Sequence, residues 1–166
     1  MIGLTLRDVR DEDLDVLFEH WVDPESNQMA AFTAADPNDR DAFNARWARF
    51  RADPSITALA IDVDGEIVGT VSSWDNEGER EITYWIGREH WGKGIATRAL
   101  TAFLEIELAR PLHAAAAADN AGSIRVLEKC GFERVGEGKG FANARGEEIE
   151  ELILMLPAEP AASSAV

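Results

Sequence analysis

The segment from Ile82 to Thr97 constrains the fold more than any other, because it predicts a strand, a glycine turn and a helix start in direct succession. The first N–H groups of a helix lack intrahelical acceptors, and the helix dipole adds positive charge at the same end. Gly92 and Gly94 have no Cβ atom, so the backbone there can adopt positive φ and approach a ligand closely. The segment therefore predicts an anion site, and the expected anion is a phosphate.

Two familiar phosphate-binding motifs fit this turn incompletely. The dinucleotide fingerprint G-x-G-x-x-G fails, because Thr97 stands where the third glycine belongs. The nucleotide P-loop G-x-x-x-x-G-K-[ST] matches at Gly87, Gly92 and Lys93, but Gly94 replaces the hydroxyl residue that should hold Mg²⁺. The P-loop remains a minor alternative.

Two longer motifs follow one another in a fixed order. The range 89–94 reads E-H-W-G-K-G at the strand-to-helix turn, and the range 120–132 reads N-A-G-S-I-R-V-L-E-K-C-G-F. The first resembles the pyrophosphate loop Q/R-x-x-G-x-G/A of the GNAT N-acetyltransferase superfamily, with Glu89 in place of the usual Gln or Arg. The second resembles N-x-x-S-x-x-x-L-E-K-x-G-F of its RimJ-like and RimL-like branch.

The resemblance implies an α+β fold with one GNAT acetyltransferase domain over residues 1–157. A central mixed, mostly antiparallel sheet of about seven strands is expected, flanked by about four helices, with the cofactor cleft between the two central strands. The implied activity moves an acetyl group from acetyl-CoA to a primary amine, on a protein N-terminus or a small molecule, by direct attack in a ternary complex. CoA is the other product. A homodimer is also expected, through the last strands or the early Trp-bearing helices.

Composition agrees with one cytoplasmic domain. The 166 residues are 46% hydrophobic, enough for one sizeable core. No apolar run reaches the roughly 18 residues of a membrane span, and the start of the chain lacks a signal-type pattern. A net charge of −15 argues against nucleic-acid binding and suits a cationic amine, although solubility alone explains it equally well. Residues 158–166 are rich in Ala, Pro and Ser and are expected to form a flexible tail.

Periodicity and turn signals predict the order of elements. Strands are expected over 4–8, 56–63, 66–74, 81–87, 112–118, 132–137 and 148–156, with a polar loop over 138–146 between the last two. Helices are expected over 11–21, where Pro24 bounds the helix, after the start signal 36–39 up to Pro54, over 94–109 and over 120–129. The buried side of the helix over 94–109 should carry Ala96, Leu100, Phe103, Leu104 and Leu108.

Acetyl transfer to an amine requires a base, polarisation of the thioester carbonyl and a proton for the thiolate. The resemblance points to Glu81 as the base, since several family members place a glutamate at the start of this strand. A solvated acid at a strand end is the simpler interpretation. Glu79 and Asp75 are weaker substitutes.

The acid is the clearest departure from the family pattern. Many family members carry a tyrosine seven residues after the motif asparagine, and Leu127 stands there in this chain. Ser123 is the preferred candidate, and Tyr84, the only tyrosine, is the other. Their simpler roles are a residue in the first turn of a helix and an aromatic packing residue.

The cofactor is expected along the strand, the glycine turn and the second motif. The expected contacts are Trp85, Ile86, Trp91, Gly92, Lys93, Gly94, Ile95, Ala96, Thr97, Asn120 and Ser123. Asn120 is equally a good helix N-cap, and Arg98 is equally an exposed cation. His20, His90 and His113 lie far apart in the sequence without metal-ligand spacing, so no metal is predicted.

Two other classes of function stay open. Because the usual tyrosine is missing, the fold could bind acyl-CoA as a sensor without turnover. A P-loop phosphotransferase would instead use the range 114–119 as a poor Walker B strand.

Overall fold

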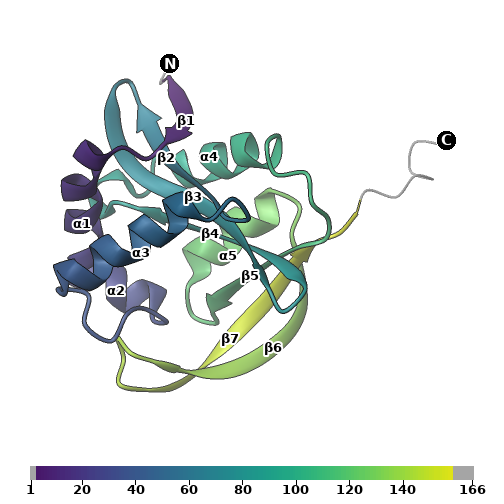
Figure 1. Ribbon diagram of the computed structural model, residues 1–166. Coiled ribbons are helices and arrows are strands. Elements are labelled where there is room, and N and C mark those ends of the chain that lie inside the picture. The colour runs from purple at the N-terminus through teal and green to yellow at the C-terminus, as the bar shows by residue number, and fades with distance from the viewer. Residues whose placement is uncertain (1–2, 159–166) are drawn as a thin grey trace, which may run out of the picture.

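A computed structural model describes residues 3–158 of the protein (Figure 1). The strands are β1 (Leu4–Asp8), β2 (Thr57–Val63), β3 (Glu66–Asn76), β4 (Glu79–Ile86), β5 (Leu112–Ala117), β6 (Glu133–Ala142) and β7 (Glu147–Leu156). The helices are α1 (Leu14–Val22), α2 (Pro24–Ala30), α3 (Arg40–Ala52), α4 (Ile95–Leu104) and α5 (Ala121–Lys129), with short 3₁₀ turns η1 (Asp11–Asp13) and η2 (Arg88–His90). The predicted tail falls almost entirely on residues 159–166, outside the described residues.

One sheet contains all seven strands, in the order β1-β2-β3-β4-β5-β7-β6. Every neighbouring pair is antiparallel except β4 and β5, which run parallel. Their pairing consists of Arg80 with Leu112 and Glu81 with His113. Beyond Glu81 the two strands part, so within residues 3–158 the β5 side of β4 has no sheet partner from Ile82 to Ile86. The predicted opening between the two central strands is confirmed.

Helices cover both faces of this sheet, with α1, α2 and α3 on one face and α4 and α5 on the other (Figure 1). The core under α4 and α5 includes the fully buried Leu100 and Phe103. A second core lies under α1 and α3 and is built around Phe43 and Trp47. The helices of each layer therefore bury their apolar sides against the sheet, as amphipathic helices require. No helix of the described part of the chain is long and apolar enough to cross a membrane.

Two local predictions were wrong, and one helix was missed. Pro24 bounds the first helix as predicted, and it also begins the additional helix α2 behind the cap formed by Asp23. The helix predicted over 94–109 ends at Leu104, and Leu108 is 74% exposed rather than buried. The chain leaves the helix here because the carboxylate of Glu107 accepts hydrogen bonds from Arg80 and Ser73 at the sheet.

The loop predicted over 138–146 is mostly strand, because β6 continues to Ala142 and pairs with β7 as far as Glu147. Gly138 and Gly140 read as loop signals in the sequence, yet they lie at alternating positions of this strand. A Cβ atom at Gly140 would lie 3.2 Å from the ring of Phe32, and one at Gly138 would lie 3.5 Å from the carboxylate of Glu151. These glycines therefore leave room for side chains that lie over β6.

A nearly buried carboxylate fastens the start of α1 to the sheet. Asp13, only 4% exposed, accepts hydrogen bonds of 2.8 and 3.0 Å from the guanidinium of Arg7 on β1, and the backbone of Arg10 donates a third of 2.7 Å. The hydrogen bonds from Arg7 lower the pKa of Asp13 although its burial opposes the shift. Because the folded state prefers the carboxylate, the stabilisation is present above the unfolded pKa and is lost as pH falls through the lower folded pKa.

We expect Asp13→Asn to lower the free energy of unfolding at neutral pH by about 2–3 kcal/mol, since it weakens charged hydrogen bonds to a partner that stays in place. The loss should shrink as the pH of the urea titration is lowered below about 4. Asp15→Asn is the matched control, because Asp15 pairs with Arg40 at 2.8 Å but is 85% exposed, and its effect should stay within about 0.5 kcal/mol. Equal losses in both variants would contradict this account.

Candidate functional site

The glycine turn between β4 and α4 has the geometry of an anion site. Gly92 and Gly94 adopt φ values of 75° and 76°, and Gly94 is the N-cap of α4. No side chain of the described residues caps this helix start, so its first N–H groups are available to a ligand. The backbone from Trp91 to Gly94 is exposed, whereas Ile95 is buried and anchors the first turn of the helix.

Side chains on both sides of this turn hold its shape. The indole Nε1 of Trp91 donates a hydrogen bond of 2.9 Å to the carbonyl of Ile86 at the end of β4. Within α4, the hydroxyl of Thr101 donates to the carbonyl of Thr97 at 2.7 Å. The exposed side chain of Lys93 lies on the turn itself and supplies a positive charge.

Glu81 occupies the position where β4 and β5 part. It pairs across the sheet with Trp74 on β3 and with His113 on β5. Its carboxylate accepts a short hydrogen bond from the side-chain amide of Asn76. The two weaker substitutes are engaged elsewhere, because Asp75 lies 3.2 Å from Arg80 and Glu79 lies 3.6 Å from His113.

A second carboxylate near Glu81 was missed by the sequence analysis. Burial, together with the negative charge of Glu81, raises the pKa of Glu151 on β7. Two nearby carboxylates with different environments can divide proton transfer and cation binding between them. The alternation of β7 puts Glu151 on one face of its strand, but only the register with β5 and β6 brings it toward Glu81.

The two candidate acids are in direct contact. The hydroxyl of Tyr84 on β4 lies 2.8 Å from the hydroxyl of Ser123 at the start of α5, so the pair joins the strand to the helix. Burial raises the pKa of Tyr84 to about 12, and the hydrogen bond to Ser123 opposes that shift. The phenol is therefore protonated at neutral pH and can donate a hydrogen bond.

Asn120 is the N-cap of α5, as its simpler interpretation predicts. Its side-chain oxygen accepts a 3.2 Å hydrogen bond from the backbone N–H of Ser123. The cap therefore fixes the first turn of α5 and, with it, the position of the Ser123 hydroxyl.

An aromatic pocket of about 140 Å³ lies between β4 and the helices α1 and α3. Trp21, Phe43 and Trp47 contribute to its walls, and Thr83 and Trp85 of β4 close one side. The ring centroids of Trp85 and Trp21 lie 5.1 Å apart. The indole N–H of Trp85 donates a hydrogen bond to the carbonyl of His20. The pocket adjoins the strand that leads from Glu81 to the glycine turn.

Arg46 brings a positive charge to this pocket and was not singled out from the sequence. Its guanidinium stacks between Phe50, at 4.7 Å, and Trp21, at 5.3 Å. It reaches solvent, yet desolvation by the pocket lowers its pKa, and the charge of Arg49 adds to the effect. Helical spacing places Phe43, Trp47 and Phe50 on the same face, and Arg46 lies three residues after Phe43 and four before Phe50.

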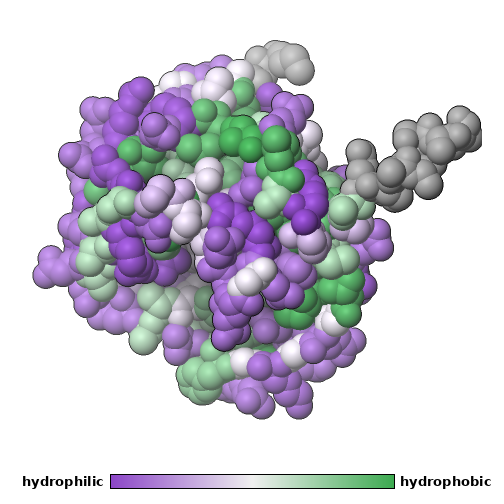
Figure 2. Space-filling view, turned by 45° about the vertical axis from the view of Figure 1, so that its right-hand side comes forward, coloured by the Kyte–Doolittle hydropathy of each residue, from purple (hydrophilic) through white to green (hydrophobic). Residues whose placement is uncertain are grey.

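The structure thus places Glu81 where the free edge of β4 begins, Tyr84 farther along the same strand in contact with Ser123, and the glycine turn after the strand ends. Trp85 and Ile86 lie on that edge, and Gly94 to Thr97 lie at the helix start. On the face shown in Figure 2 hydrophilic residues predominate, and hydrophobic residues gather in several patches between them.

Comparisons with known proteins agree with this geometry. Residues 3–133 match the family described as Acetyltransferase (GNAT) domain. A protein of Bacillus licheniformis, named uncharacterized N-acetyltransferase p20, is 31% identical over 168 residues that cover 92% of each chain. The match gives no support to the P-loop phosphotransferase considered above.

Solved structures share the fold at lower identity. Ribosomal-protein-alanine N-acetyltransferase from Brucella melitensis superposes with a TM-score of 0.78 at 23% identity, covering 93% of this chain and 99% of that one. RimJ of Mycobacterium smegmatis, solved in complex with CoA-disulfide, gives a TM-score of 0.76 at 22% identity over 95% of this chain and 82% of that one. The parted central strands and the glycine turn are accordingly features of an acetyltransferase, and the chain belongs to the GNAT family.

Proposed function

We propose that this protein transfers the acetyl group of acetyl-CoA to a primary amine in a ternary complex. The observation that carries the proposal is the free edge of β4, which begins at Glu81 and leads directly to the positive-φ glycine turn. A pantetheine arm is a short extended chain with two amide groups, so it can lie along a free strand edge much as an added strand does. Its pyrophosphate would then reach the helix start at Gly94.

In this arrangement each part of the donor has a matching group on the protein. The pyrophosphate accepts hydrogen bonds from the backbone of the turn and the first turn of α4, with Lys93 adding charge. Trp85 and Ile86 present strand backbone to the pantetheine arm, and Asn120 holds the first turn of α5 beside it. The proposed contacts are Trp85, Ile86, Trp91, Gly92, Lys93, Gly94, Ile95, Ala96, Thr97, Asn120 and Ser123.

The transfer then needs two proton movements. A neutral amine attacks the thioester carbonyl carbon, a C–N bond forms and the C–S bond breaks. We propose that Glu81 accepts the proton that leaves the amine, directly or through one water. Ser123 gives its proton to the departing thiolate and takes up the proton of the Tyr84 phenol, which is protonated before the reaction at neutral pH. Water then returns a proton to Tyr84.

The acceptor is proposed to enter from the side of the aromatic pocket. Its walls suit the apolar part of an amine or of an N-terminal residue, while Glu81 and Glu151 attract a cationic amine before it loses its proton. We retain protein N-termini and small amines as the two acceptor classes. The Brucella neighbour is named for ribosomal-protein alanine, which supports the first class.

A homodimer through the last strands is part of the same proposal. β6 is an edge strand of the sheet, and it carries the exposed apolar side chains Val135, at 52%, and Phe141, at 61%. A second copy could cover both side chains and the unpaired strand edge.

Turnover separates this proposal from a non-catalytic acyl-CoA sensor. Release of free CoA from acetyl-CoA, measured against a panel of amines and N-terminal peptides, should be acceptor-dependent and accompanied by the acetylated product. Tight binding of acetyl-CoA without any acetylated product across the panel would favour the sensor.

The glycine turn gives the most direct test of donor binding. We expect the double variant Gly92→Val, Gly94→Val to abolish CoA binding in calorimetry, because β-branched residues do not tolerate φ near 75° and would crowd the phosphate site. Gly78→Val is the matched control, since Gly78 has φ 88° in the β3–β4 hairpin away from the turn, and it should keep CoA affinity. Unchanged CoA affinity in the folded double variant would refute the assignment.

Glu81→Gln should lower kcat by about 10²-fold if the carboxylate is the base, while an increase confined to the acceptor KM would assign it to acceptor binding. Glu79→Gln, two residues earlier on the same strand, is the control and should leave both constants close to wild type. Kinetics with a confirmed acceptor across a pH series around neutrality would measure this. A Glu81→Gln enzyme with wild-type constants would mean that solvent or another group takes the proton.

The Tyr84–Ser123 pair makes unequal contributions in this scheme. Ser123→Ala should lower kcat by about 10²-fold, and Tyr84→Phe should lower it less, because Ser123 keeps its own hydroxyl. Since Tyr84 is the only tyrosine, the ultraviolet absorbance of phenolate reports it alone, and half-ionisation is expected near its raised pKa of about 12. Wild-type kcat in both variants would show that neither hydroxyl protonates the thiolate.

A further inference from the structure

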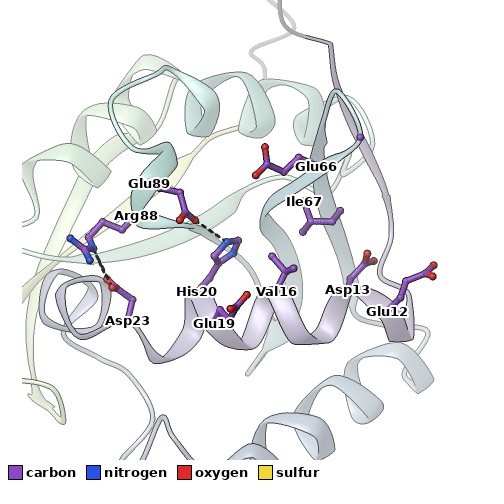
Figure 3. Close-up of a pocket in the computed structure, with 11 residues that line it drawn as sticks. Glu12, Asp13, Val16, Glu19, His20, Asp23, Glu66, Ile67, Arg88 and Glu89 are labelled. Atoms are coloured by element: carbon purple, nitrogen blue, oxygen red, sulfur yellow. Dashed lines mark hydrogen bonds and ion pairs between the residues drawn. The ribbon is translucent and has the colours of Figure 1, made fainter.

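A cavity of about 810 Å³ lies apart from the acceptor pocket, between α1, the start of β3 and the turn η2 (Figure 3). Its lining is strongly acidic. Asp13 and Asp23 are neutralised by Arg7 and Arg88, but Glu19, Glu66 and Glu89 add negative charge without a Lys or Arg partner among the described residues. Such a field concentrates cations.

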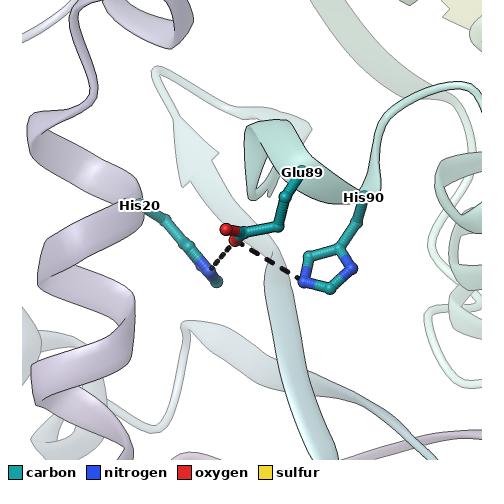
Figure 4. Close-up of side chains that lie close together, drawn as sticks. All are labelled: His20, Glu89 and His90. Atoms are coloured by element: carbon teal, nitrogen blue, oxygen red, sulfur yellow. Dashed lines mark ion pairs between the residues drawn. The ribbon is translucent and has the colours of Figure 1, made fainter.

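Three side chains converge at one edge of this cavity. His20 projects from α1, and Glu89 and His90 project from η2, with the carboxylate between the two imidazoles (Figure 4). The Nε2 atoms of His20 and His90 lie 3.5 and 3.6 Å from the same oxygen of Glu89, and the candidate ligand atoms all lie within 4.8 Å of one another. The nearest further group is Glu66, whose carboxylate is 3.8 Å from His90 Nε2.

These distances exceed a normal N–H···O hydrogen bond of about 2.7–3.2 Å. The two N···O distances, 3.5 and 3.6 Å, are close to the roughly 3.3 Å that separates ligand atoms around a tetrahedral zinc ion with bonds near 2.0–2.1 Å. The separation between the two imidazoles is within 4.8 Å, so small side-chain rotations would bring the three groups onto one ion, with Glu66 or a water for the fourth position.

The protein also makes a specific place for one of these ligands. His20 is 6% exposed, and its imidazole lies against the backbone of Gly87, where a Cβ atom would come within 2.6 Å of Nε2. Its other nitrogen, Nδ1, is buried without a hydrogen-bond partner in the described part of the chain, so Nε2 is the polar atom that the ring presents. Burial lowers the pKa of His20, which favours the neutral imidazole that binds metals.

We propose that His20, Glu89 and His90 form a site for a divalent transition-metal ion of the zinc type. Two imidazoles and one carboxylate suit Zn²⁺, Co²⁺ or Ni²⁺, whereas Mg²⁺ and Ca²⁺ prefer oxygen ligands throughout. The ion would join α1 to η2, the segment that leads directly into Trp91 and the glycine turn. Because His20 and His90 lie far apart in the sequence, motifs based on the spacing of metal ligands do not detect these three residues.

The test uses the full chain without added histidines, stripped of metal by a chelator. Competition with a chromophoric chelator should show one equivalent of Zn²⁺ bound, and Co²⁺ should give visible d–d absorption of a tetrahedral centre. Zn²⁺ should also raise the melting temperature by mass action, while Mg²⁺ and Ca²⁺ should not.

Glu89→Gln and His90→Ala should each weaken Zn²⁺ binding at least about 100-fold, because loss of even an outer-shell partner costs roughly 10- to 100-fold. Glu89 is the safer substitution for folding, since its side chain is 69% exposed. His113→Ala is the matched control, because His113 also faces one glutamate at 3.6 Å but has no third ligand, and it should keep full affinity.

Failure of the wild-type chain to bind Zn²⁺ would overturn the proposal. Equal Zn²⁺ affinity in wild type and in a folded Glu89→Gln variant would overturn it as well. Circular dichroism of each variant establishes that it is folded before the comparison is made.

Discussion

The opening between β4 and β5 requires the two strands to be held firmly where they pair, at Arg80 and Glu81. The side chain of Arg80 holds them there. Its guanidinium lies 2.9 Å from Glu107 in the α4–β5 connection, donates 3.1 Å to Ser73 on β3 and 2.7 Å to the carbonyl of Ser55 before β2. The side chain of Arg80 thereby ties three other segments to β4 at the point where it pairs with β5. The two strands can diverge beyond that point while the sheet stays together. A half-buried ion pair with several hydrogen-bond partners is well suited to fixing geometry of this kind.

The divergence leaves strand backbone without a sheet partner, which would be costly if it were buried away from water and ligand. The fold leaves this edge open in a cleft and surrounds it with rigid elements. Asn120 caps the start of α5, Ile95 anchors α4, and Trp91 fixes the end of β4. The proposed reactive positions are consequently held by packed helices and strands, while the glycine turn between them is exposed. Such preorganisation is what positioning a thioester against an amine requires.

Local chemistry explains which parts could be predicted from the sequence. Gly92 and Gly94 indicate a backbone with positive φ, and Asn120 indicates a helix start three residues before Ser123. What depends on distant contacts could not be predicted. The early end of α4 requires Glu107 to meet Arg80, and the glycines of β6 look like a loop until β7 pairs with them. Glu151 and the grouping of His20 with His90 likewise need the register of whole strands and the packing of α1 on η2, which no periodicity contains.

The glycines of β6 have a consequence for how such an enzyme can change over evolution. Gly138 and Gly140 leave space above the sheet that Glu151 and Phe32 occupy, and they belong to a part of the chain that shares no residue with the glycine turn. A methyl group added at Gly140 would lie 3.2 Å from the ring of Phe32, which would have to shift, whereas one added at Gly138 would make ordinary contact with Glu151. Because Phe32 also lines the aromatic pocket, a single small substitution on β6 can change the shape of that pocket while the backbone of the glycine turn stays as it is.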